Sequence, residues 1–299
     1  SPAQERLIRT FQTLSDMRQI RIFLEMIKFE HTIFALPFAY LGMVLAARGW
    51  PSWRTFLWIT VAMVAARTLA MSVNRVVDRD LDARNPRTAQ RALPQGLLTP
   101  KQVWSVAAIS LAIFLGAAWQ LNDFVLRLAP LAVIALVGYS YTKRFTWLSH
   151  WVLGITDGAA AAGAWAAVRG SLADPTPWLL WGAVTVWIAG FDLIYACQDT
   201  DFDRVEGLYS VPARFGNTVA LRWAKINHAL TVLTLAAVGW LQHLGWVFWM
   251  GVAMTAGLLW WENSLVKPND LSRVNLAFFN VNGYISVLVF VTAWIGLNW

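Results

Sequence analysis

Nine long apolar stretches, separated by short polar breaks, constrain this 299-residue chain more than any other feature. A helix needs about 20 mostly apolar residues to cross a membrane. The composition agrees, because 58% of the residues are hydrophobic and only 14% are charged, against about 25% charged in globular proteins. We therefore predict an all-α polytopic membrane protein and exclude a soluble enzyme, a disordered chain and a nucleic-acid partner. The stretches centre on residues 30–49, 55–76, 103–120, 124–142, 150–168, 178–198, 218–240, 245–265 and 275–297.

Two regions follow from this pattern: residues 1–28, and a domain at 29–299 of nine transmembrane helices around a central cavity. Apolar residues of the first region recur at steps of three or four, which is typical of an amphipathic helix lying in the membrane interface. A solvated helical tail is the alternative. No short apolar segment with a cleavage site heads the chain, so we expect a mature, uncleaved N-terminus. The recurring residues are Leu7, Phe11, Leu14, Met17, Ile20, Leu24 and Ile27.

Basic residues predict the orientation, because cytoplasmic loops carry the excess of Lys and Arg. Most of the Lys and Arg behind the net charge of +7 fall on the side of the N-terminus. The opposite side holds Arg48, Arg54, Arg127 and Arg169. We expect an integral protein of the cell inner (plasma) membrane, with the N-terminus and the polar site cytoplasmic and the C-terminus outside. The single cysteine, Cys197, excludes a disulfide framework and a Cys-based zinc site.

Two acidic motifs stand at the ends of the second and sixth stretches. Each spaces its oxygen-bearing side chains by four residues, which places them on one face of a continuous helix. Carboxylates gathered at a membrane edge repel one another and are costly to desolvate, and Mg²⁺ prefers oxygen ligands shared with substrate phosphates. One motif alone fits solvated helix ends equally well, but a second at matching depth favours a metal site. The proposed ligands are Asn74, Asp78, Asp82, Asp199 and Asp203.

Basic and aromatic residues beside the motifs predict an anion site. Arg67 lies two helical turns before Asn74, where an unpaired charge is expensive, so we expect it to pair with a phosphate or a carboxylate. Asp192, two turns before Asp199, is a candidate proton acceptor or Arg67 partner. Guanidinium groups suit phosphate geometry, although topology alone explains any one loop arginine. The substrate-binding candidates are Arg67, Arg79, Arg87, Arg91, Tyr141, Lys143, Arg144 and Arg214, and the catalytic candidates are Asp78, Asp199, Asp192 and Tyr195.

These motifs resemble the UbiA superfamily of intramembrane aromatic prenyltransferases. The family has an Asn-x-x-x-Asp-x-x-x-Asp motif after its second span and an Asp-x-x-x-Asp motif after its sixth, as at Asn74 and at Asp199 here. Residues 85–94, 141–144 and 207–216 resemble the loops of the family, and the likeness covers roughly residues 21–297. Residues 26–37 resemble the quinone-pathway branch of the family. So does Arg75, because the residue after the first motif asparagine is more commonly an aspartate in the family.

The resemblance implies Mg²⁺-dependent transfer of a polyprenyl group from a polyprenyl diphosphate to a 4-hydroxybenzoate-like aromatic acid. It implies a role in ubiquinone biosynthesis and a prenyl tail lying among the spans toward membrane lipid. One alternative is the same chemistry on a naphthoate-type menaquinone precursor. Another, from a different class, is a cation-coupled transporter, since paired intramembrane acids also fit cation coordination.

Overall fold

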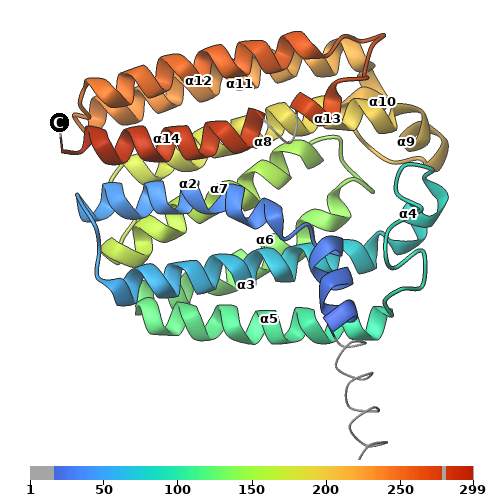
Figure 1. Ribbon diagram of the computed structural model, residues 1–299, viewed down its shortest axis with the longest axis horizontal. Helices are drawn as coiled ribbons and strands as arrows, with labels where there is room; N and C mark the ends of the chain where they lie inside the picture. The colour runs from blue at the N-terminus through green and yellow to red at the C-terminus, as the bar shows by residue number, and fades with distance from the viewer. Residues whose placement is uncertain (1–16, 278–280, 299) are drawn as a thin grey trace, which may run out of the picture.

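The protein is all-helical over the part described by its structure, a computed structural model covering residues 17–277 and 281–298. The long helices run side by side, and the short helices α4, α9, α10 and α13 lie toward one end of the bundle (Figure 1). Most of residues 1–28, including the expected interfacial helix, falls outside the described residues. Only its last part is described, as a helix over residues 17–26 that precedes a turn.

The long helices form a closed ring within the described chain, because each packs against the next in the order α3, α5, α6, α7, α8, α11, α12, α14 and α2, with α2 returning to α3. Helix α2 also packs across the ring against α7. The helices are α2 (Glu30–Ala47), α3 (Trp53–Val77), α4 (Arg79–Arg84), α5 (Pro100–Leu121), α6 (Asp123–Thr142), α7 (Ser149–Arg169), α8 (Thr176–Ala196), η1 (Cys197–Asp199), α9 (Thr200–Glu206), α10 (Val211–Phe215), α11 (Asn217–Leu241), α12 (Trp246–Leu265), α13 (Val274–Leu276) and α14 (Asn282–Gly296).

Six helical stretches of the described chain are long and apolar enough to cross a membrane. They are Trp53–Val77, Pro100–Leu121, Asp123–Thr142, Ser149–Arg169, Thr176–Glu206 and Asn217–Leu241. The expectation of an integral, all-α membrane protein is thus confirmed, whereas the count of nine spans stays a prediction. The ninth apolar stretch is described in two parts, α13 (Val274–Leu276) and α14 (Asn282–Gly296), and residues 278–280 between them lie outside the described residues.

Local sequence signals explain where helices begin and how closely they pack. Ser52 caps α3 by accepting a hydrogen bond from the Thr55 amide at 3.1 Å, and Thr99 and Gln102 form a capping box at the start of α5. Gly42 of α2 lies against the Ala161 carbonyl of α7, where a methyl group would overlap the backbone. Small residues at such crossings let membrane helices approach closely.

Both acidic motifs lie across a helix break, which corrects the expectation of one continuous helical face. Helix α3 ends at Val77 and α4 begins at Arg79, so that Asp78 is the junction, with φ −92° and ψ 1°. Asp199 holds the equivalent place between α8–η1 and α9, with φ −104° and ψ 9°. This sparsely populated backbone region is frequent at active sites. The spacing identified the residues, but the break redirects the second half of each motif.

Candidate active site

Asp78 is the most buried acid of the first motif, with a side chain only 4% exposed. Its Oδ2 accepts from Lys143 Nζ at 2.5 Å and from Asn74 Nδ2 at 3.2 Å. Its Oδ1 accepts from Arg144 Nη2 at 3.0 Å. Lys143 and Arg144 follow the last turn of α6, so the contact joins α3 to α6 and gives one buried carboxylate two positive partners.

The next acid of the motif, Asp82, is paired with a loop arginine. Arg91 Nη1 lies 2.8 Å from both carboxylate oxygens of Asp82. The Thr88 hydroxyl donates to the Asp82 carbonyl at 3.0 Å and so holds the intervening loop against α4. The basic loop that follows the first motif therefore folds back onto it.

Asp199 of the second motif joins the same loop across the bundle end. Arg87 donates from Nε to Oδ1 at 2.9 Å and from Nη2 to Oδ2 at 2.5 Å, which is the two-point geometry typical of Arg and a carboxylate. Its Nη1 donates to the Tyr195 hydroxyl at 2.7 Å, and Asn85 Nδ2 donates to Asp199 Oδ1 at 2.9 Å. Burial lowers the pKa of Arg87, but the bonds to Asp199 and the nearby charges outweigh it and raise that pKa above its usual value. Arg87 thus stays charged and connects the two motifs.

Asp203 is bonded to a serine and, among the described residues, forms no ion pair. Ser210 donates to Asp203 Oδ2 at 2.7 Å and also caps α10. The preceding residue, Tyr209, donates its amide to the Lys143 carbonyl at 2.7 Å. The loop after the second motif is therefore attached both to Asp203 and to the segment that carries Lys143.

Asp192 pairs with a histidine, which corrects the expectation that Arg67 is its partner. His150 Nδ1 lies 2.6 Å from Asp192 Oδ2. His150 Nε2 accepts the Val211 amide at 3.2 Å, so the ring proton must reside on Nδ1 and point to Asp192. The imidazole is buried, and it ties α7 to α8 and to the start of α10. Sequence reasoning could not choose this partner because His150 and Asp192 are brought together only by packing between helices.

Arg67 lies deeper in the bundle, where its Nε has no hydrogen-bond partner among the described residues. It is within electrostatic range of Tyr139 of α6 and Asp157 of α7, and Asp157 is in turn within range of Asp192. Side chains of four helices thus converge below the ion pairs. The result is a cluster of polar and charged side chains in which the Arg67 Nε still has a donor to offer.

Three further substrate-binding candidates form no hydrogen bond or ion pair with a motif acid in the described part of the chain. Arg79 is paired with the adjacent Asp80 at 3.0 Å and is half exposed. Arg214 is exposed and lies over the Phe215 ring at 5.5 Å. Tyr141 is 41% exposed and lies beneath the Arg144 guanidinium. Their roles stay predictions, and the structure does not bring Arg79 or Arg214 to the motif acids.

The donor set fits a hard cation that is completed by substrate. Asn74 and the four aspartates offer only oxygen ligands, which is the chemistry of Mg²⁺. In the described chain no three His, Cys, Asp or Glu side chains lie close enough to hold a metal by themselves. Mg²⁺ is commonly held by one or two carboxylates together with phosphate oxygens, so these residues suit a metal that arrives with a diphosphate.

Comparison with known proteins decides the family. The model of the UbiA prenyltransferase family matches residues 35–284. The chain belongs to this family. It is a membrane prenyltransferase, as the resemblance of its two acidic motifs implied.

Among the curated relatives of this prenyltransferase is a 4-hydroxybenzoate octaprenyltransferase of Tolumonas auensis, 32% identical over 82% of this chain and 85% of that protein. Another is a 4-hydroxybenzoate solanesyltransferase of Synechocystis, 34% identical over 71% of this chain and 72% of that protein. Among solved structures, a UbiA homologue from Aeropyrum pernix K1 matches with a TM-score of 0.82 and 34% identity over 89% of this chain and 98% of that one. A UbiA homologue from Archaeoglobus fulgidus, bound to DMAPP and Mg²⁺, has the same fold, with a TM-score of 0.69 and 19% identity over 92% of this chain and 99% of that one.

Three polar residues of the prenyltransferase site were missed from the sequence: Asn85, His150 and Ser210. Asn85 stands before Pro86, a pair typical of turns, and Ser210 stands before a proline at a helix start, a capping signal. Both signals indicate local structure but not the acid that each side chain contacts. His150 carries no such signal, since a lone histidine at the start of an apolar stretch has many roles.

Proposed function

We propose that this prenyltransferase transfers a polyprenyl group from a polyprenyl diphosphate to the ring of 4-hydroxybenzoate or a close analogue, with Mg²⁺, in ubiquinone biosynthesis. One observation carries the proposal: Lys143, Arg144, Arg87 and Arg91 all lie within bonding distance of the motif acids. The names of the relatives supply the substrate class. The diphosphate and Mg²⁺ bound to the Archaeoglobus fulgidus homologue agree with it.

The cations are proposed to change partners when substrate binds. Asn74 and the aspartates would hold Mg²⁺, which would supply Lewis-acid stabilisation of the departing diphosphate. When the diphosphate enters, Lys143, Arg144, Arg87 and Arg91 leave the carboxylates and donate to its oxygens. Their charge is placed where negative charge develops, which favours the transition state over the bound substrate. Cleavage of the C1–O bond then leaves an allylic cation.

The aromatic acceptor is proposed to bind below the diphosphate, beside Arg67 and its polar neighbours. The Arg67 guanidinium can donate to the carboxylate of an aromatic acid and so direct the ring toward C1. Attack by the ring carbon beside the hydroxyl forms the new C–C bond, and Asp192 accepts the ring proton that is lost. The π faces of Tyr139, Tyr141 and Tyr195 stabilise the cation, and the apolar walls exclude the water that would capture it.

The membrane arrangement is proposed to follow the sequence pattern. Nine spans would place both motifs and the basic loops at the cytoplasmic face of the inner membrane, with the C-terminus outside. The ring of long helices supports the number of spans, and six apolar helical stretches support their place in a membrane. A reporter fused after residue 299 tests it, because a cytoplasmic signal would contradict the count of nine.

Product masses test the reaction. Purified protein in detergent with geranyl diphosphate, Mg²⁺ and 4-hydroxybenzoate should release diphosphate and form a product heavier than the acceptor by one geranyl group less a hydrogen. A panel containing naphthoates and phenols identifies the acceptor. Failure of every aromatic acceptor would contradict the proposal.

Two conservative variants test the site. Asp78→Asn and Asp199→Asn should lower turnover at least a hundredfold, because each removes a charge that binds the metal. Asp201→Asn is the matched control. The Asp201 side chain is fully exposed, and its ion pair with Arg204 is long, at 3.8 Å. Turnover near normal in Asp78→Asn or Asp199→Asn would remove that residue from the site.

A naphthoate-type acceptor remains the alternative within the proposed chemistry, and the acceptor panel separates it from 4-hydroxybenzoate. Membership of a prenyltransferase family favours the enzyme over a cation-coupled transporter. The motif acids also lie at helix ends, whereas transporter sites lie near the membrane midplane.

A further inference from the structure

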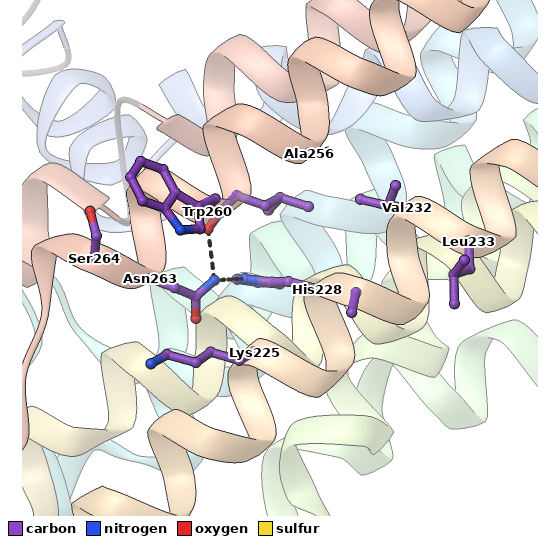
Figure 2. A pocket seen from close by; sticks show the side chains of 10 residues that line it. Lys225, His228, Val232, Leu233, Ala256, Trp260, Asn263 and Ser264 are labelled. Carbon is purple, nitrogen blue, oxygen red and sulfur yellow. Dashed lines mark hydrogen bonds between the residues drawn. The ribbon is translucent and has the colours of Figure 1, made fainter.

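A pocket of about 600 Å³ lies between α11 and α12, outside the site described above. Its volume is within the usual range of small-molecule sites. Figure 2 shows Lys225, Asn263 and Ser264 toward one end of the pocket and Val232, Leu233 and Ala256 farther along it. The pocket therefore has a polar end and an apolar end.

The polar end points to the same end of the bundle as the acidic motifs. Lys225 follows the start of α11 at Asn217 by about two turns, so it lies ~12 Å along the helix axis. Ser264 is next to the last residue of α12. The apolar residues lie farther toward the middle of both helices. A lipid acyl chain could follow them while its headgroup remained at the membrane interface.

Lys225 is exposed and forms no ion pair with another described residue. A lysine at this depth in a spanning helix is costly unless its charge is paired or extends to the interface. Arg222, one turn nearer the helix start, is also exposed and adds positive charge on that side. The positive charge at this end of the pocket therefore favours an anionic ligand.

The pocket is held in shape by a hydrogen bond between its two helices and by another within α12. Asn263 Nδ2 of α12 donates to His228 Nδ1 of α11 at 2.7 Å and to the Leu259 carbonyl at 2.7 Å (Figure 2). Trp260 forms one wall and is 75% exposed, which suits a tryptophan near the membrane interface. A ligand would meet a formed pocket and would not have to separate the helices.

From these features we propose that the groove between α11 and α12 binds an anionic phospholipid. Its phosphate group lies at Lys225 and Ser264, and one acyl chain follows Val232, Leu233 and Ala256. The opposite charge of the headgroup satisfies the lysine, and the acyl chain covers the apolar part of the pocket. The site is separate from the polyprenyl diphosphate site and does not depend on the proposed reaction.

Native mass spectrometry of the full chain in detergent tests this inference, with phosphatidylglycerol and phosphatidylcholine of identical acyl chains as probes. Phosphatidylglycerol should bind the wild type more tightly than phosphatidylcholine. Lys225→Gln should weaken phosphatidylglycerol binding about fivefold, since one lysine near an anionic headgroup is worth about 1 kcal/mol. Ala256→Phe, which fills the apolar end, should weaken binding of both lipids.

Lys101→Gln is the matched control, because Lys101 is an exposed lysine at the same end of the bundle but on α5. Equal binding of the two lipids would overturn the proposal, as would equal losses in Lys225→Gln and Lys101→Gln. Displacement of phosphatidylglycerol by geranyl diphosphate would assign the groove to the isoprenoid and also overturn it. A dimer that excludes lipid and is broken by Ala256→Phe would assign it to a second copy of the chain.

Discussion

Arg87 provides the sharpest test of how the two motifs cooperate. Its guanidinium donates to both oxygens of Asp199 and to the Tyr195 hydroxyl, and it lies 4.9 Å from the centre of the Tyr195 ring. Arg87→Lys keeps the charge but removes the planar group that makes these three bonds together. The substitution thus separates geometry from charge at the junction of the motifs.

The expected loss can be worked from the contacts. Lysine can keep one of the three bonds, so two are lost, and hydrogen bonds to charged groups contribute about 1.5–3 kcal/mol each. The Arg87 side chain is 30% exposed, and solvent reduces the contribution of such hydrogen bonds. We therefore expect Arg87→Lys to lose about 2 kcal/mol of interaction free energy. If Arg87 turns from Asp199 to the diphosphate during the reaction, kcat/KM for the prenyl diphosphate should fall about thirtyfold.

Initial rates with varied geranyl diphosphate at saturating Mg²⁺ and acceptor measure this loss, and a thermal unfolding curve shows whether the variant is folded. Arg169→Lys is the matched control, because Arg169 is exposed at the opposite end of α7. An Arg87→Lys protein with wild-type kcat/KM would refute the exchange of partners. A fall in unfolding temperature with unchanged kinetics would show that Arg87 only joins the two motifs structurally.

Two further predictions concern positioning and packing. His150→Phe should raise KM for the prenyl diphosphate several-fold, because it releases the start of α10 at Val211. His150→Gln should recover part of the loss in the same kinetic assay, and equal KM values in all three proteins would contradict this role. Gly42→Ala should lower the free energy of unfolding by about 1–3 kcal/mol, the usual cost of overpacking, whereas Gly163→Ala, with open space around it, should not. Thermal unfolding in detergent compares the two, and equal stability would contradict the close packing of α2 on α7.

The acids of the site could be predicted from the sequence because their spacing is local. Asp78 and Asp199 stand at the ends of apolar stretches, and the repeat of four residues set both motifs apart from ordinary helix ends. The break at each of these residues was not predictable in the same way. A turn near φ −90° and ψ 0° has no single residue signature, and it is held here by contacts from other helices.

The partners of the acids could be predicted as a group but not one by one. The basic loops indicated an anion site, yet only the structure paired Arg87 with Asp199, Arg91 with Asp82, and Lys143 with Asp78. These contacts join residues far apart in the chain, and each depends on how helices and loops pack. Spacing along one helix contains no information about that packing.

The sequence by itself determined the helical membrane class, the acidic motifs and the family, because hydrophobic length and residue spacing act within one segment. Tertiary structure alone decided that Asp78, Asp82 and Asp199 are paired with loop cations, that Asp192 is bonded to His150, and that the Arg67 Nε has no partner among the described residues. The physical reason is the reach of charge interactions. A buried carboxylate takes the nearest cation in space, and the fold sets which residue that is.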